Sequence, residues 1–167
     1  MNQSSSSVHP SSVAVRSERV AIVCASWHHE IVHQARDAAV AEFKRNGLSE
    51  EQVDHFDVPG AFEIPLVAQK LARSGRYDAV MACALIVNGG IYRHEFVTTA
   101  VIDGLMRVQL DTGVPVISVA LTPRDFHEHE EHIRFFQQHF VKKGAEAAGA
   151  CLRTMAQSAV LNSLYGA

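Results

Sequence analysis

Residues 56–65, FDVPGAFEIP, combine a turn, an aromatic wall and a carboxylate within one short segment. The aspartate, the first proline and Gly60 are residue types of tight turns. Glu63 follows where the amides of a helix N-terminus would hold its charge, because Pro65 is typical of the first turn of a helix. The segment therefore predicts a strand end, a turn and a new helix that offers a carboxylate to a ligand.

Residues 85–94, LIVNGGIYRH, repeat this plan of apolar strand, glycine turn and helix start. In a parallel sheet both turns lie at the carboxyl edge, where open α/β folds bind their ligands. Gly89 and Gly90 can bring backbone N–H groups to a phosphate, although two glycines usually mark only a tight turn.

Trp27, the only tryptophan, directly follows the first predicted strand and so reaches the same edge. Without context, a core position would be the better interpretation of a single tryptophan. Beside a carboxylate and a glycine turn, its aromatic face suits a flat polar heterocycle that carries a polyol, together with a small phosphate.

Two histidine-rich segments resemble metal sites. Residues 29–33, HEIVH, match the H-E-x-x-H pattern of zinc proteases, but no obvious third ligand follows, and exposed polar residues of a helix are the better interpretation. Residues 127–132, HEHEEH, place His129 and His132 on one face of a predicted helix. This second segment lacks cysteine and is typical of a solvated helix face.

Short apolar runs alternate with amphipathic segments along the chain. The predicted strands are residues 20–25, 52–58, 79–87 and 116–121. The predicted helices are residues 29–46, 63–73, 93–111, 123–140 and 143–161, the last two separated near Val141. This alternation predicts an α/β fold, with a parallel sheet between two helix layers, in a single domain over residues 18–167 after a flexible, serine-rich leader of residues 1–17.

Composition excludes several classes of protein. With 47% hydrophobic and 20% charged residues, the 167-residue chain can build a core. A net charge of -3 gives no reason to expect nucleic acid or an anionic membrane as partner. No apolar run approaches the roughly 20 residues of a membrane span, and the start of the chain lacks the apolar region of a secretory signal. We expect a cytoplasmic protein whose three cysteines are reduced.

From about residue 19 to residue 155 the chain resembles the lumazine synthase family of the riboflavin pathway. The GAFEIP motif of residues 60–65, the glycine turn of residues 89–90, and the GVPV and KGAEA segments of residues 113–116 and 143–147 follow in family order. Trp27 and the histidine-rich fourth helix resemble the second type of the enzyme, known from rhizobia and related bacteria.

The resemblance implies a flavodoxin-like fold with strand order 2-1-3-4 and a transferase reaction. In that reaction 5-amino-6-(D-ribitylamino)uracil condenses with 3,4-dihydroxy-2-butanone 4-phosphate to 6,7-dimethyl-8-ribityllumazine, and phosphate leaves. The chemistry needs no cofactor and no metal, because much of the rate comes from holding two reactants together. An alternative is a flavin- or lumazine-binding protein that keeps the pocket but has little turnover.

The resemblance also assigns roles to individual residues. Trp27 would stack on the pyrimidine ring, and backbone groups of Gly90 and Ile91 would bind the phosphate. The remaining implied contacts are the ribityl chain with Ala61, Phe62 and Glu63, the uracil edge with backbone groups of Leu85, Ile86 and Val87, and a wall from a neighbouring subunit with Ser118 and His132. The implied assembly is a homo-oligomer of pentameric rings, paired into a decamer, with active sites shared between neighbours.

Two positions depart from the family pattern. Arg93 stands where the family has its catalytic histidine, and His94 is next to it. Because Arg stays protonated near neutral pH, it suits phosphate binding better than proton transfer. His132 in turn stands where the family has a phosphate-binding arginine, so Arg93 and His132 are candidates for exchanged roles. Lys143 matches a family lysine only through its Lys-Gly context.

Overall fold

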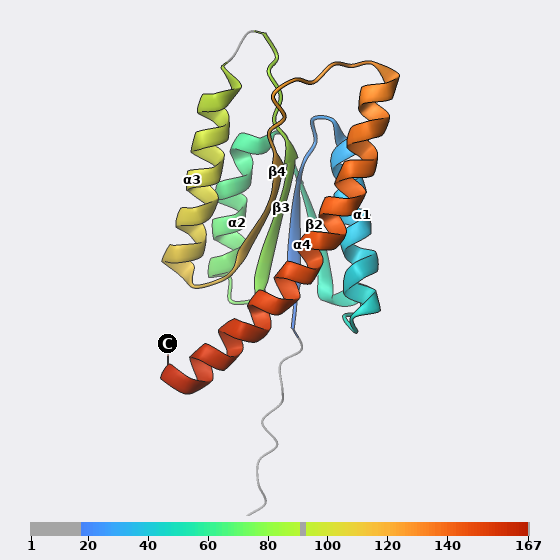
Figure 1. The fold of residues 1–167 in the computed structure, drawn as a ribbon. Helices are drawn as coiled ribbons and strands as arrows, with labels where there is room; N and C mark the ends of the chain where they lie inside the picture. The colour runs from blue at the N-terminus through green and yellow to red at the C-terminus, as the bar shows by residue number, and fades with distance from the viewer. Residues whose placement is uncertain (1–17, 91–92, 167) are drawn as a thin grey trace, which may run out of the picture.

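The computed structural model describes residues 18–90 and 93–166 of the chain. Four parallel strands form one sheet in the order β2-β1-β3-β4. The strands are β1 Val20–Ala25, β2 Val53–Val58, β3 Ala79–Leu85 and β4 Val116–Leu121. Helices α1 His29–Arg45 and α4 Glu130–Tyr165 cover one face, and α2 Ile64–Arg73 and α3 His94–Thr112 cover the other (Figure 1). The predicted three-layer α/β/α sandwich and its strand order are confirmed.

The central strands β1 and β3 are buried along their whole length. Their apolar runs are continuous because each has a strand on either side and a helix layer on either face. On β1, Ile22 and Cys24 face the layer of α1 and α4, whereas Val23 and Ala25 face α2 and α3. The sheet therefore separates two cores and brings the carboxyl ends of its strands to one edge.

The predicted break between two C-terminal helices is wrong, because residues 130–165 form the single helix α4. Gly144 lies in the middle of that helix, where a Cβ would be 2.1 Å from the carbonyl oxygen of Ala35 on α1. Its small size serves the close approach of two helices rather than a helix end. Residues 123–129, predicted as helix, lie before α4 outside any helix, so His129 is an N-cap with extended backbone.

The other helices agree with the predicted ranges to within a residue or two at their ends. The 3₁₀ turns η1 Glu50–Gln52 and η2 Ala61–Glu63 precede β2 and α2. Gly104 of α3 lies against Pro65 of α2, because a Cβ on this glycine would be 2.9 Å from the Cβ of that proline. None of the helices that the structure describes is long and apolar enough to cross a membrane.

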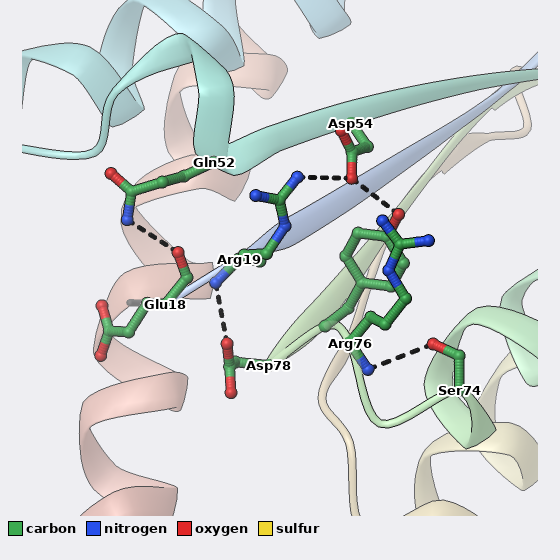
Figure 2. Close-up of polar contacts among 8 residues, drawn as sticks. Glu18, Arg19, Gln52, Asp54, Ser74, Arg76 and Asp78 are labelled. Atoms are coloured by element: carbon green, nitrogen blue, oxygen red, sulfur yellow. Dashed lines mark hydrogen bonds and ion pairs between the residues drawn. The ribbon is translucent and has the colours of Figure 1, made fainter. Parts of the chain in front are cut away.

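A polar network ties the amino ends of three strands together at the edge opposite the glycine turns (Figure 2). The guanidinium of Arg19 donates to the Asp54 carboxylate on β2 at 2.8 Å, and the Tyr77 hydroxyl donates to the same oxygen at 2.7 Å. The backbone amide of Arg19 donates to the carboxylate of Asp78 at 2.8 Å. These charge-assisted bonds fix the register of β1 against β2 and β3.

Candidate active site

A cavity of about 600 Å³ opens at the carboxyl edge of the sheet. Segments that follow β1, β2 and β3 supply its walls, together with the first turns of α3. Its described lining is Ala25, Trp27, His28, Pro59, Gly60, Ala61, Phe62, Glu63, Leu85, Ile86, Val87, Gly89, His94, Val97 and Glu128. The structure therefore brings together residues of the FDVPGAFEIP turn, the tryptophan and the glycine turn, as the sequence predicted.

Trp27 and Phe62 form an open aromatic rim. The two residues are 72% and 65% exposed, respectively, although both are large and apolar. Gly60 lies beneath them, and a Cβ there would be 4.0 Å from the Trp27 ring and 3.2 Å from the Glu63 carboxylate. A side chain at position 60 would thus crowd the carboxylate that faces the cavity.

The Glu63 carboxylate is held by the backbone of its own turn. Its Oε2 accepts a hydrogen bond from the Gly60 amide at 2.9 Å. Because Ala61–Glu63 is a 3₁₀ turn and α2 begins at Ile64, Glu63 is the N-cap of the helix rather than its first residue. One carboxylate oxygen is engaged in this way, and the other accepts no hydrogen bond from the part of the chain that the structure describes.

The end of β3 forms the floor of the cavity. Leu85 and Ile86 are buried and Val87 is half-buried. The Ile86 amide already donates to the Leu121 carbonyl of β4 at 2.9 Å. A ligand that contacts Ile86 through its backbone would therefore have to donate to the carbonyl.

The glycine turn connects β3 to α3. Gly90 has a φ of +74°, a left-handed conformation that glycine adopts without a steric penalty. Its amide donates to the side-chain oxygen of Asn88 at 3.2 Å, so that the amide is engaged within the turn. Ile91, the second predicted phosphate-binding residue, lies outside the described residues.

His94 and Arg93 have different surroundings. His94, the first residue of α3, lines the cavity, and its Nδ1 is buried with no hydrogen-bond partner among the described residues. That nitrogen lies 3.6 Å from Glu95 Oε2, beyond hydrogen-bond length. Arg93 is exposed, and its guanidinium lies over the Phe96 ring at 4.7 Å from the centroid. Of the two residues, only His94 is among the described lining of the cavity.

The comparisons with known proteins agree on one family. The family model of 6,7-dimethyl-8-ribityllumazine synthase matches residues 17–159. The chain belongs to this family. A 6,7-dimethyl-8-ribityllumazine synthase of Rhodococcus erythropolis is 60% identical over 136 residues, which are 81% of this chain and 88% of that protein.

Relatives named 6,7-dimethyl-8-ribityllumazine synthase 2 match at similar coverage. Those of Pseudomonas syringae pv. tomato and Bradyrhizobium diazoefficiens are each 54% identical over 138 residues, which are 83% of this chain. The similarity to these second-type proteins confirms the resemblance drawn from Trp27 and the histidine-rich segment. The family also accounts for the flavodoxin-like fold.

Five described residues of the predicted site are not among those that line the cavity of one chain: Gly90, Arg93, Ser118, His132 and Lys143. Ser118 is exposed on the edge strand β4, and its Oγ accepts the Ala120 amide at 3.3 Å. His132 lies on α4, where its Nδ1 accepts the His127 amide at 3.0 Å. Lys143, also on α4, pairs with Glu146 at 2.8 Å.

Sequence reasoning missed His28 and Glu128, which also line the cavity. His28 has a φ of 54°, the one described non-glycine residue with a positive φ, and it caps the start of α1. Its ring packs edge-on against Phe126 at 5.0 Å, which joins the cavity to the aromatic segment before α4. The only sequence signal for His28 was its position directly after Trp27.

Proposed function

We propose that this chain condenses 5-amino-6-(D-ribitylamino)uracil with 3,4-dihydroxy-2-butanone 4-phosphate to 6,7-dimethyl-8-ribityllumazine, in riboflavin biosynthesis. The observation that carries the proposal is the cavity in which Trp27, Glu63 and His94 converge, in a chain of the lumazine synthase family. An aromatic face, a carboxylate and an imidazole are the groups that a heterocycle, a polyol and a proton transfer require. The catalytic domain extends over residues 18–167 and acts in the cytoplasm.

The ribityl-pyrimidine binds along the β1 and β2 side of the cavity. Trp27 stacks on the pyrimidine ring, and Phe62 and Ala61 flank the ribityl chain. The free oxygen of Glu63 accepts hydrogen bonds from the ribityl hydroxyls, since Gly60 occupies only the other oxygen. Backbone groups at Leu85, Ile86 and Val87 bind the uracil edge, Ile86 through its carbonyl because Leu121 takes its amide.

Two adjacent residues have separate roles in the reaction of the phosphorylated ketone. His94 transfers protons during Schiff-base formation and loss of phosphate, because it is the one described residue of the pair Arg93 and His94 that lines the cavity, and an imidazole can both accept and give a proton near neutral pH. Arg93 neutralises the phosphate, and the backbone amides of Gly90 and Ile91 are the further donors that the family resemblance implies, with the Gly90 amide released from Asn88 Oδ1 on binding. Within this division His132 supplies a phosphate contact, and Lys143 a more distant positive charge, from a second subunit.

The pocket is completed by a neighbouring subunit of a homo-oligomer. In one chain the Trp27 and Phe62 rim is open, and β4 is an unpaired edge of the sheet that carries the exposed Ser118. Helix α3 also presents large apolar side chains to solvent: Phe96 at 65%, Ile102 at 38%, Met106 at 52% and Leu110 at 74% exposure. A pentameric ring buries this face and brings Ser118 and His132 of one subunit to the cavity of the next.

A turnover assay tests the proposal. Purified protein is mixed with both substrates, and the absorbance of the lumazine product is followed together with phosphate release in equal amounts. The variant His94→Gln, which keeps a polar side chain of similar size, is the matched control. Tight binding of the ribityl-pyrimidine without product would favour a lumazine-binding protein, and neither binding nor product would contradict both functions.

A further inference from the structure

A cluster of three potential metal ligands lies on the other face of the sheet from α2 and α3. Cys24, His33 and Asp57 each offer one ligand atom, and these atoms all lie within 4.8 Å of one another. The three residues come from β1, α1 and β2. None of them lines the active-site cavity, whose lining begins one residue later on β1, at Ala25.

The fold brings these side chains together for simple geometric reasons. Cys24 and Asp57 are register partners on the neighbouring strands β1 and β2, so that their side chains lie beside each other on the same face. His33 is on α1, the helix that covers this face, and its Nε2 lies 3.2 Å from Asp57 Oδ1. Small displacements of these side chains would bring a thiolate, an imidazole and a carboxylate around one ion.

The cluster has a buried end and an open end. Cys24 is buried, whereas the His33 and Asp57 side chains are 24% and 55% exposed. An ion therefore reaches the buried sulfur from the open side, where His33 and Asp57 lie. Arg36 on α1 interacts electrostatically with Cys24 and Asp57, and its Nε donates to Asp37 Oδ1 at 2.8 Å, so that its positive charge is partly neutralised.

A second cysteine supports the first. Cys83 on β3 is the register partner of Cys24, so that the two buried thiols lie side by side on the same face of the sheet. With Cys24 bound to an ion as a thiolate, the neighbouring Cys83 thiol is placed to donate its S–H to that sulfur, the kind of outer contact that orients a metal ligand.

We infer that Cys24, His33 and Asp57 form a zinc site that joins α1 to the edge of the sheet. A thiolate, an imidazole and a carboxylate are ligands that Zn²⁺ accepts, and water would complete four-coordinate geometry. On binding, the Cys24 thiol loses its proton to solvent and the sulfur–zinc bond forms. The ion acts on stability, since the condensation reaction uses no metal.

Two other sets of histidines are alternative candidates for a zinc site. His29 and His33 are the two histidines of the H-E-x-x-H segment, with ring centroids 5.8 Å apart. The His29 side chain is 68% exposed, and the group of ligand atoms around the Cys24 sulfur is completed by His33 and Asp57. The second set is His127, His129 and His132, whose rings gather before and at the start of α4.

The test is zinc titration of tag-free full-length protein that has first been stripped with a chelator. Calorimetry on the wild type should give about one Zn²⁺ per chain, and Co²⁺ substitution should give the near-ultraviolet charge-transfer band of a thiolate ligand. Cys24→Ser and Asp57→Asn should each weaken zinc binding by at least about tenfold, since removing even an outer-sphere partner of a metal ligand costs about that much.

Matched controls separate this site from its competitors. His29→Ala, Asp37→Asn and His129→Ala should bind Zn²⁺ like the wild type, and zinc should raise the unfolding temperature of these three variants but not of Asp57→Asn. The inference is overturned by the absence of saturable binding, by loss of binding in His29→Ala or His129→Ala, or by unchanged binding in Cys24→Ser and Asp57→Asn. The lumazine assay is independent of these outcomes.

Discussion

The Glu63 carboxylate is bonded to the Gly60 amide three residues earlier in the chain, at 2.9 Å. This bond closes the turn between β2 and α2 and fixes the carboxylate at the cavity before any ligand arrives. Pro65 and Gly104, in close contact behind the turn, hold α2 against α3. The turn is therefore rigid on both sides, which is the support that a preorganised binding group requires.

Glu63→Gln should weaken binding of the ribityl-pyrimidine by about tenfold or more, because a charge-assisted hydrogen bond contributes roughly 1.5–3 kcal/mol. The glutamine oxygen can still accept from Gly60, so the fold should be retained. Calorimetric titration with the substrate measures the loss, and a thermal unfolding curve like that of the wild type controls for structure. Unchanged affinity would remove Glu63 from the site.

Trp27 is the only tryptophan, so its fluorescence reports on the cavity alone. If it stacks on the pyrimidine, substrate analogues or riboflavin should quench this fluorescence. Trp27→Ala should lose about 1–1.5 kcal/mol of binding free energy beyond the effect of lost area, whereas Trp27→Phe should keep most of it. Constant fluorescence at saturating ligand would place the stacking surface elsewhere.

His94 and Arg93 should differ in which kinetic constant they control. Replacing a proton-transferring group commonly costs about 10²-fold or more, so His94→Gln should lower kcat with little change in KM. Arg93→Gln should mainly raise KM for the phosphorylated ketone. Initial rates with each substrate varied in turn measure both. A large fall in kcat for Arg93→Gln, with His94→Gln unaffected, would reverse the two roles.

The layer arrangement and the position of the cavity could be predicted because local patterns decide them, whereas the strand order was implied by the family resemblance. The continuous apolar runs of β1 and β3 predict buried strands, and the turns around Gly60 and Gly90 mark the edge where the site lies. His28 could not be found in this way. Its left-handed backbone and its contact with Phe126, almost a hundred positions away, depend on tertiary structure.

The continuity of helix α4 also could not be predicted from the local sequence. Glycine lowers helix propensity by about 1 kcal/mol, so the local sequence around Gly144 does not predict a helix that continues through it. Only the approach of Ala35 on α1 explains why glycine is required within a continuous helix. The difference between Arg93 and His94 also depends on where α3 begins, because Arg93 is the N-cap with extended backbone and His94 is the first helical residue.

The contact between Arg19 and Asp54 should stabilise the fold in a pH-dependent way. Hydrogen bonds from Arg19 and then from Tyr77 lower the pKa of the Asp54 carboxyl. The folded state therefore binds this proton more weakly than the unfolded state, and the stabilisation is complete above the unfolded pKa of about 3.9 and lost as pH falls through the lower folded value.

The variant Asp54→Asn isolates this contribution. Its free energy of unfolding should be lower than that of the wild type by about 1 kcal/mol near pH 7, as for a partly exposed pair. The difference should decrease as the pH falls below about 5. Urea unfolding at fixed protein concentration measures it, with the exposed Glu51→Gln on η1 as the control for net charge. A difference that grows on acidification would contradict the assignment.

Assembly is the prediction on which the shared pocket depends. A cavity whose last wall includes Ser118 and His132 of a neighbour is incomplete in a monomer, so light scattering at neutral pH should give a mass of about ten chains, as two paired rings. Met106→Glu introduces a charge into the exposed apolar face of α3 and should dissociate the rings with loss of turnover. Phe135→Glu, on α4, changes a side chain that is 57% exposed in one chain and should leave rings of about five chains that remain active. Full activity in a monomeric Met106→Glu variant would show that each chain carries a complete site.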